Sequence, residues 1–280
     1  MPSPQVIGYV VDGGETGSDA AVFSPRFVNP DKSVYSGLYE GGPMPKSGSG
    51  SIRGAVDASP GVFPYAFGED ASEPVVISIE RRPTLDGENH VAGVIWNAAR
   101  ALCEYMVTDM GSAAFEGKSV LEIGSGTGLT GMVAAALGAT VVLTDQEPAI
   151  AMLRDQIALN KLQNRVSAAQ LDWGPDGDNQ LAALGDFDLI LGTDVTYTAL
   201  KELQHTLLAL TSGPTPPQLL FCHERRWPGT DAYFEKLMAP HFDYTPVHAT
   251  SFEDSGEIVV FTLTRKAGAD MVAGDEAGDE

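Results

Sequence analysis

The sequence predicts an α/β fold with a seven-stranded, mostly parallel sheet and helices on both faces. Between about residues 119 and 222, short apolar runs alternate with helical patterns, which is typical of parallel strands joined by crossover helices. The last two apolar runs, 244–250 and 258–263, have no helix between them. They therefore predict an antiparallel hairpin at the C-terminal end of the sheet.

The strands are predicted from apolar runs that end at turn residues or at an acid. The apolar run at 74–80 is followed by Asp86-Gly87, a turn signal, and the run at 140–143 leads to Asp145. Pro and Gly in residues 213–217 mark a surface link before the fifth strand of the sheet. Ahead of the closing hairpin, we expect strands at 74–80, 120–123, 140–143, 166–171, 187–191 and 219–222.

The helices are predicted from apolar residues that recur at helical spacing. In residues 95–110, Ile95, Ala99, Leu102 and Met106 share one face. Gly138 closes the second helix in a typical C-terminal position. We expect further helices at 129–137, from Pro148 onward, from Leu200 onward and at 231–237.

Composition divides the 280 residues into three parts. Residues 1–70 are rich in Gly, Pro and Ser, and we expect an N-terminal extension that is partly loop or disordered, with one candidate strand at 5–11. Residues 71–266 carry the strands and helices of the predicted domain. Residues 267–280 are small and acidic without periodicity, which predicts a disordered tail.

The formal net charge of −21 disfavours sequence-independent binding to nucleic acid and favours a basic partner. The two cysteines, Cys103 and Cys222, lie far apart in apolar runs and form no disulfide framework or zinc pattern. Residues 123–144 carry no charge, but their five glycines indicate a glycine loop rather than a membrane span. With no secretory signal, we expect a cytoplasmic, also nuclear, monomer without a metal.

The chain is organised around residues 119–131, SVLEIGSGTGLTG, which predict a strand, a glycine loop and the start of a helix. Residues 126–131 match the dinucleotide fingerprint Gly-x-Gly-x-x-Gly, with Asp145 lying 19 residues after Gly126. Residues 122–128 instead match the acid-x-Gly-x-Gly-x-Gly loop that binds S-adenosylmethionine in Rossmann-like methyltransferases. Glu122 would repel a pyrophosphate but would attract the ammonium and sulfonium of S-adenosylmethionine, directly or through water, so electrostatics favours the second ligand.

Four stretches, in order, resemble one known family. They are GVIW at 93–96, the glycine loop at 120–131, LDWG at 171–174 and GTDVTY at 192–197. With them, the chain from Val75 to Lys266 resembles the seven-strand protein methyltransferases of methyltransferase family 16, which are mostly protein-lysine N-methyltransferases. The first seventy residues resemble nothing in that family, so substrate identity does not follow.

The resemblance implies roles for individual residues toward S-adenosylmethionine. The loop is formed by Gly124, Ser125 and Gly126, and Asp145 holds the ribose. Thr193, where a small Ala or Ser is more common, lies against the cofactor beside the reaction site. Trp96 is expected to line the methionine end, and Trp173 the adenine.

Asp194 and Tyr197 are the predicted catalytic residues. A free lysine has a pKa of about 10.4, so making it neutral near pH 7.4 costs about 4 kcal/mol. Asp194, at the carboxyl end of a central strand, would orient the amine first and accept a proton second. Tyr197 would form a wall of the lysine channel. The expected substrate is a lysine in a folded protein that is basic, chaperone-like or related to translation.

Other interpretations remain open at this stage. Asp194 could instead be the N-cap of the next helix, Tyr197 could be packing, and Trp173 could cover the sheet edge. Residues 223–227 fit a solvated loop better than a substrate contact. As alternative functions we keep methylation of histidine, arginine or a small molecule, a dinucleotide-dependent dehydrogenase, and a non-catalytic module that binds a partner.

Overall fold

A computed structural model describes residues 60–68, 74–82, 91–226, 228–253 and 255–267, with short strand segments before and between them. These segments are β1 (Val10–Val11), β2 (Phe23–Ser24), β3 (Ala55–Val56), β6 (Thr84–Leu85) and β7 (Glu88–Asn89). The predicted acidic tail beyond residue 267, most of the expected strand at 5–11 and the Asp86-Gly87 turn lie outside the described residues.

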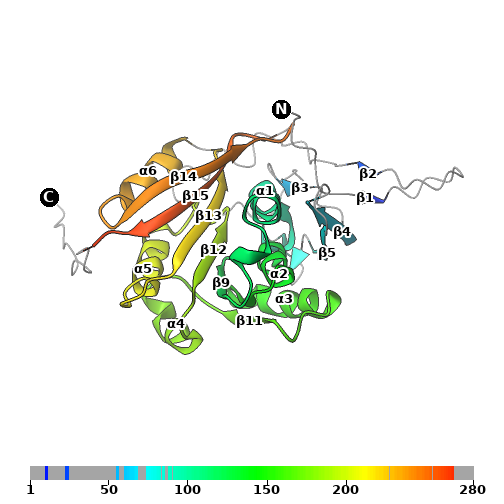
Figure 1. Cartoon of the computed structure of the whole chain (residues 1–280), viewed down its shortest axis with the longest axis horizontal. Coiled ribbons are helices and arrows are strands. Elements are labelled where there is room, and N and C mark those ends of the chain that lie inside the picture. Colours follow the sequence, from blue (N-terminus) through cyan, green and yellow to red (C-terminus); the bar gives the residue numbers. More distant parts are fainter. Residues whose placement is uncertain are drawn as a thin grey trace, which may run out of the picture.

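The central sheet has seven strands in the order β11-β10-β9-β12-β13-β15-β14 (Figure 1). The five strands from β11 to β13 are parallel to one another, and β15 and β14 are added antiparallel. This confirms the predicted fold class and its closing hairpin. The strands are β9 (Ser119–Ile123), β10 (Thr140–Asp145), β11 (Val166–Gln170), β12 (Leu189–Thr193), β13 (Gln218–Glu224), β14 (Phe242–Thr250) and β15 (Ile258–Arg265).

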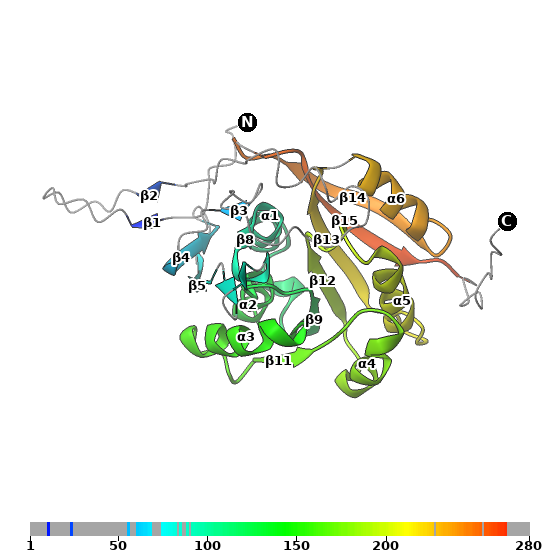
Figure 2. The same cartoon turned by 180° about the vertical axis from the view of Figure 1, so that it is seen from behind.

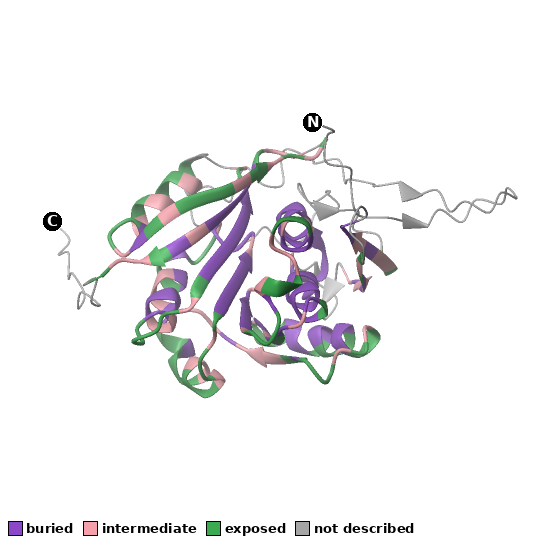
Figure 3. Ribbon diagram, viewed as in Figure 1, coloured by how far each residue is buried: buried purple, intermediate pink, exposed green. Residues whose placement is uncertain are grey.

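Helices cover both faces of this sheet because its central strands are apolar on both sides (Figures 2 and 3). In β9, Val120 packs into one core and Leu121 into the other, as the two-residue repeat of a strand requires. The first core lies under α1 (Asn97–Tyr105), α2 (Leu129–Ala136) and α3 (Glu147–Leu159). The second lies under α4 (Asp178–Leu184), α5 (Leu200–Leu210) and α6 (Pro228–Met238).

The predicted helix at 95–110 begins later than expected. Ile95–Trp96 form the short strand β8, which pairs with β3, and α1 follows at Asn97. A π-type turn, Met106–Met110, then extends α1 to the predicted end. Trp96 is therefore held by strand pairing just ahead of the helix.

A pair of strands crosses the expected boundary between extension and domain at residue 70. A strand inside the extension, β4 (Gly61–Phe67), pairs antiparallel along its whole length with β5 (Val75–Arg81), which corresponds to the predicted strand at 74–80. Tyr65 and Phe67 of β4 are fully buried. Pro64 made this segment look like a loop, yet a strand at the edge of a sheet tolerates proline.

Side chains of α3 join this ribbon to the domain. Ser78 N donates to Asn160 Oδ1 at 2.8 Å, and Asn160 Nδ2 donates to Ser78 O at 2.7 Å. Gln156 makes the same pair of bonds with the N–H and C=O of Glu80. Two amides one helical turn apart thus replace a neighbouring strand along β5.

Candidate active site

A cavity of about 770 Å³ opens where β9, β10 and β12 end, at the carboxyl edge of the parallel strands. This is where open α/β sheets place their ligands. Nine of the ten residues predicted from the sequence line it; Glu122 does not. The nine are Trp96, Gly124, Ser125, Gly126, Asp145, Trp173, Thr193, Asp194 and Tyr197.

The glycine loop has a backbone that only glycine adopts easily. Gly126 has φ +52°, and a Cβ added there would lie 3.3 Å from Ala92 O. Gly126 N donates to Asp145 Oδ2 at 2.8 Å, so the loop after β9 is tied to the end of β10. A Cβ on Gly124 would lie 2.8 Å from Val195 and 3.2 Å from the Trp173 ring. The loop therefore needs residues without a side chain at Gly124 and Gly126 in order to pass between its neighbours.

Ser125 points its hydroxyl toward the sheet. Ser125 Oγ accepts a hydrogen bond from Thr144 N at 3.0 Å and donates to Glu122 O at 3.2 Å. The hydroxyl thus satisfies one backbone group of β9 and one of β10 near the ends of these two parallel strands. In the predicted cofactor loop, Ser125 would therefore contribute its backbone and not its hydroxyl group.

Glu122 has a different place from the one expected. Its side chain is 1% exposed and lies outside the cavity lining. Its Oε2 accepts a hydrogen bond from Gly131 N, at the start of α2, at 3.0 Å. Burial raises the pKa of the carboxyl group to about 8, against the opposing effect of the Gly131 bond. Glu122 thus supports the start of α2 from outside the cavity lining, and its attraction for a cationic cofactor, directly or through water, stays a prediction.

The cavity fits S-adenosylmethionine by its lining. Its volume lies within the roughly 300–1,000 Å³ of small-molecule sites. The half-buried carboxylate of Asp145 and the side chain of Trp173 both belong to this lining. Each Asp145 oxygen accepts one backbone N–H, from Gly126 or Gln146, and retains lone pairs for hydroxyl groups. A sugar with hydroxyl groups would match the Asp145 carboxylate, and a flat base would match the Trp173 ring.

Asp194 lies directly after β12 in an unusual conformation. Its φ is +51°, a left-handed value that aspartate tolerates better than most residues. Asp194 N donates to Cys222 O at 2.9 Å, and its Oδ1 accepts from Glu224 N at 3.0 Å. The next helix has Ala199 as its N-cap residue. The N-cap interpretation of Asp194 is therefore wrong.

Tyr197 is half-buried in the cavity wall beside Thr193 and Asp194. Burial raises the pKa of its hydroxyl to about 12, and the negative charges of Asp145 and Asp194 add to this effect. Tyr197 consequently stays a neutral phenol near pH 7. It can donate or accept a hydrogen bond inside the cavity, which suits a channel wall.

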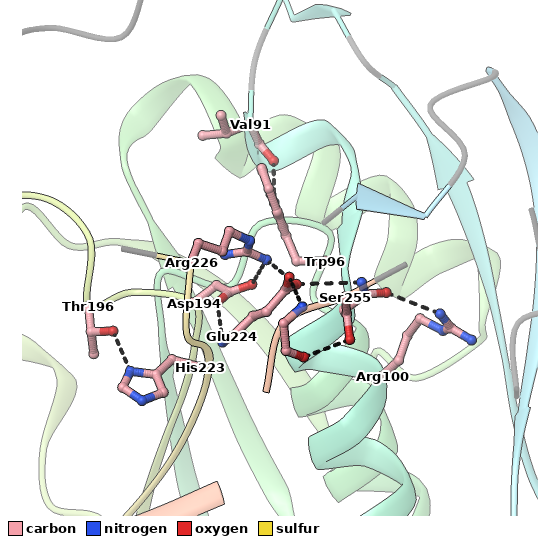
Figure 4. A network of polar contacts seen from close by, with 11 residues as sticks. Val91, Trp96, Arg100, Asp194, Thr196, His223, Glu224, Arg226 and Ser255 are labelled. Atoms are coloured by element: carbon pink, nitrogen blue, oxygen red, sulfur yellow. Dashed lines mark hydrogen bonds and ion pairs between the residues drawn. The ribbon is translucent and has the colours of Figure 1, made fainter. Parts of the chain in front are cut away.

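Arg226 and Glu224 are site residues that the sequence interpretation missed. Arg226 Nη2 donates to Asp194 Oδ2 at 2.9 Å and to Glu224 Oε2 at 2.8 Å (Figure 4). The two carboxylates raise the pKa of the guanidinium. Glu224 belongs to β13, and Arg226 lines the cavity. The solvated loop expected for residues 223–227 is therefore wrong for His223, Glu224 and Arg226, all of which are buried or nearly so.

His223 lies on the opposite side of β13 from Glu224. Its Nδ1 shares a hydrogen bond of 2.9 Å with the hydroxyl of Thr196. Its ring packs 5.0 Å from the ring of Phe261. Burial lowers the pKa of His223 to about 4, so it is neutral at pH 7. It acts as a packed, uncharged neighbour of the site.

Metal-binding clusters and membrane-spanning helices are both absent from the part of the chain that the structure describes. There, no group of three or more His, Cys, Asp and Glu side chains is arranged to hold a metal ion. None of the helices in the same residues has the length and apolar character needed to cross a membrane.

Comparison with known proteins agrees with this site. A model of the family described as lysine methyltransferase, methyltransferase family 16, matches residues 80–239. Protein N-lysine methyltransferase METTL21A of Danio rerio is 41% identical over 169 residues, covering 59% of this chain and 74% of that protein. EEF1A lysine methyltransferase 3 of Mus musculus is 34% identical, covering 54% and 64%. Protein-lysine N-methyltransferase EFM6 of Saccharomyces cerevisiae is 34% identical, covering 54% and 71%.

The family model spans more than half of the chain and includes every residue that lines the cavity. The relatives share the activity that the four sequence motifs imply, and their names agree on lysine as the acceptor. The chain therefore belongs to the lysine methyltransferase family, as an S-adenosylmethionine-dependent protein-lysine N-methyltransferase.

Proposed function

We propose that this enzyme methylates a lysine in a basic segment of a partner protein, with Asp194 and Tyr197 presenting the amine. The observation that supports this most is the charge of the cavity wall. Its lining contains five acidic residues and one basic residue, Arg226. The five are Asp145, Asp172, Asp176, Asp194 and Glu202.

The residues at the end of β12 would orient the acceptor. When bound, S-adenosylmethionine supplies a methyl group activated by its sulfonium. Both oxygens of Asp194 already accept one hydrogen bond, and each keeps a lone pair that an incoming N–H can reach. A lysine ammonium is about six pKa units less acidic than an ordinary carboxylic acid. Asp194 would therefore align the amine first, and removal of the proton would fall mainly to solvent.

The remaining site residues would hold the cofactor. Asp145 would accept from the ribose hydroxyls, and Trp173 would lie against the adenine. Trp96 and Thr193 would line the methionine end, next to the predicted catalytic pair. The backbone of residues 124–126 would approach the cofactor where no side chain intervenes.

The identity of the partner is a narrower proposal. One relative is named for EEF1A, so purified EEF1A is the first substrate to test, followed by basic chaperones. The net charge of −21 favours such basic partners by long-range attraction. We further propose that the enzyme works as a monomer in the cytoplasm, and also in the nucleus.

The decisive experiment is labelling with tritiated S-adenosylmethionine, applied to purified EEF1A and to fractionated lysate. We expect a discrete protein band, with the label on lysine when the peptide is identified by mass spectrometry. Raising ionic strength from about 0.1 M to about 1 M shortens the Debye length from about 10 Å to about 3 Å, which should weaken labelling of a basic partner.

Asp194→Asn tests the predicted catalytic role. Asparagine keeps the size of the side chain and also tolerates the left-handed backbone, so the fold should persist. We expect labelling to fall about 100-fold, as when a reacting group is misplaced. Asp186→Asn, the same change at an exposed position ahead of β12, should leave labelling unchanged. Label on histidine or arginine would refute the lysine assignment, and undiminished labelling by Asp194→Asn would refute the role of Asp194.

A further inference from the structure

Arg226 is held in the site by two carboxylates that come from different strands. Its Nη2 lies 2.9 Å from Asp194 Oδ2 and 2.8 Å from Glu224 Oε2 (Figure 4). The three side chains are 4%, 7% and 1% exposed, respectively. Ion pairs this well shielded from water act much more strongly than exposed ones.

Glu224 is held by contacts from outside this cluster. Its Oε1 accepts from Gly256 N at 3.0 Å, and Asn97 Nδ2 lies 3.5 Å from its Oε2. The Arg226 guanidinium also lies 5.2 Å from the ring of Trp96. Elements far apart in the sequence thus fix Glu224, Glu224 fixes Arg226, and Arg226 fixes the Asp194 carboxylate at the cavity wall.

The cluster leaves one formal negative charge, since two carboxylates meet one guanidinium. Without Arg226, an incoming amine would face both carboxylates and would be held as an ammonium, which has no lone pair to attack a methyl group. Without Glu224, the remaining pair would be neutral and would draw in the substrate cation only weakly.

We propose that Arg226 is a positioning residue for methyl transfer: it aims Asp194 at the acceptor amine, and with Glu224 it sets the local charge so that lysine enters without being trapped in its charged form. This inference rests on the proposed function of Asp194. It adds two residues of β13 and the loop after it to the predicted reaction site.

The other ionisable groups around Arg226 allow a clean test. Burial raises the pKa of Tyr197 to about 12 and lowers that of His223 to about 4. Burial also raises the pKa of Asp231, on α6, to about 6. Between about pH 7 and pH 9.5 these groups hold their charge, whereas Glu122, whose pKa burial raises to about 8, titrates in this window in wild type and in every variant alike. A difference between the variants in this window therefore reports the acceptor amine. The titratable groups that interact electrostatically with Arg226 are Asp194, Tyr197, Cys222, His223, Glu224 and Asp231.

The first measurement is the pH dependence of methyl incorporation into the labelled protein substrate. Arg226→Gln should move the rising limb of the rate to higher pH by about one unit, and Glu224→Gln should move it to lower pH. Arg226→Lys keeps the charge and should restore the wild-type position of the limb. Arg225→Gln is the matched control, because Arg225 pairs with Glu235 and Glu257 outside the cavity. Shifts of the same sign in Arg226→Gln and Glu224→Gln, or no shift in either, would overturn the proposal.

The second measurement needs no protein substrate. Sinefungin resembles S-adenosylmethionine but carries an amine in place of the transferred methyl, whereas S-adenosylhomocysteine has neither group. Calorimetry at pH 7 should show that Arg226→Gln binds sinefungin about tenfold more tightly, relative to S-adenosylhomocysteine, and that Glu224→Gln binds it more weakly. Equal ratios in all variants that retain wild-type unfolding midpoints would contradict the charge argument. If wild-type enzyme labelled no protein, the proposed function would fail, while this titration would still decide the role of Arg226.

Discussion

Glu122 supports the start of α2 although its side chain lies outside the cavity lining. The carboxyl group lies beneath residues 124–128, accepts a hydrogen bond from Gly131 N, and is buried among apolar neighbours. Burial raises its pKa from 4.5 to about 8. In the unfolded chain the same group ionises near its ordinary value. The folded state therefore binds a proton between these two pH values that the unfolded state releases.

This difference predicts how stability depends on pH. A group that is protonated only in the folded state lowers stability as pH rises, by about 1.4 kcal/mol per unit while only the unfolded chain is ionised. The contribution is fully favourable below pH 4.5 and is lost as pH rises toward 8. We expect Glu122→Gln, which can still accept from Gly131 N, to gain stability over wild type by a few kcal/mol between pH 5 and pH 8.

Urea unfolding of both proteins at pH 5 and pH 8 measures this gain. Glu147→Gln removes the same charge from an exposed position in the first turn of α3, and it should show no such gain. A constant difference between Glu122→Gln and wild type at both pH values would mean that Glu122 is ionised in the folded protein.

Nine of the ten predicted site residues line the cavity, and they could be found at the residue scale because they belong to recognisable motifs. The roles assigned to them stay predictions. Arg226 and Glu224 were missed for a physical reason: their signal depends on β13 lying beside β12, with Thr193 paired to Cys222. Residues just beyond that pair must meet at the sheet edge. Sequence order alone gives neither the neighbouring strand nor its register.

At the scale of elements, Gly131 sets how closely α2 approaches the sheet. A Cβ at this position would lie 2.3 Å from Leu143 Cδ2 and 2.8 Å from Glu122 Oε2. Real Cβ atoms do not come so close to their neighbours, so α2 would have to move away from β9 and β10. The lack of a side chain at Gly131 thus allows α2 to lie close to the sheet and the glycine loop.

Gly131→Ala should therefore destabilise the protein despite its better helix propensity. Alanine in a helix gains about 1 kcal/mol over glycine, but overpacking a tight contact costs about 1–3 kcal/mol and also strains the Glu122 bond. We expect a net loss of about 2 kcal/mol, seen as a fall of roughly 4–8 °C in the thermal midpoint. Gly213→Ala is the control, because a Cβ there meets nothing within 4 Å. Equal midpoints for the two variants would show that α2 yields without cost.

Periodicity predicted the type of each major element better than its ends. The parallel strands and their helices follow from alternating apolar runs, since both faces of the sheet are covered. The short helix α4 was not predicted because its seven residues are too few to show a helical repeat clearly. The strand β4 escaped prediction because Pro64 and two flanking glycines, Gly61 and Gly68, imitate a loop.

At the scale of the whole molecule, the ribbon of β4 and β5 lies almost entirely ahead of residues 80–239, which the family model matches. Tyr65 and Phe67 belong to the same buried cluster as residues of α1, α2 and the sheet. Gln156 and Asn160 hydrogen-bond the backbone of β5 from α3. We therefore propose that the folding unit includes β4, although composition places the start of the domain at residue 71.

Two shortened chains test where the domain begins. A chain starting at residue 55 keeps β3 and β4, whereas one starting at residue 71 loses both and exposes Ile77 and Ile79 of β5. Burying each large apolar side chain contributes about 1.5–3 kcal/mol, so removing Tyr65 and Phe67 should cost at least about 3 kcal/mol. The loss of the β4–β5 hydrogen bonds adds to this cost. We expect the urea midpoint to fall markedly for the chain starting at 71.

Binding of S-adenosylmethionine, followed by calorimetry, should persist in the chain starting at 55. Indistinguishable midpoints for the two chains would place β4 outside the cooperative unit, and the interface with α3 would then contribute nothing to stability.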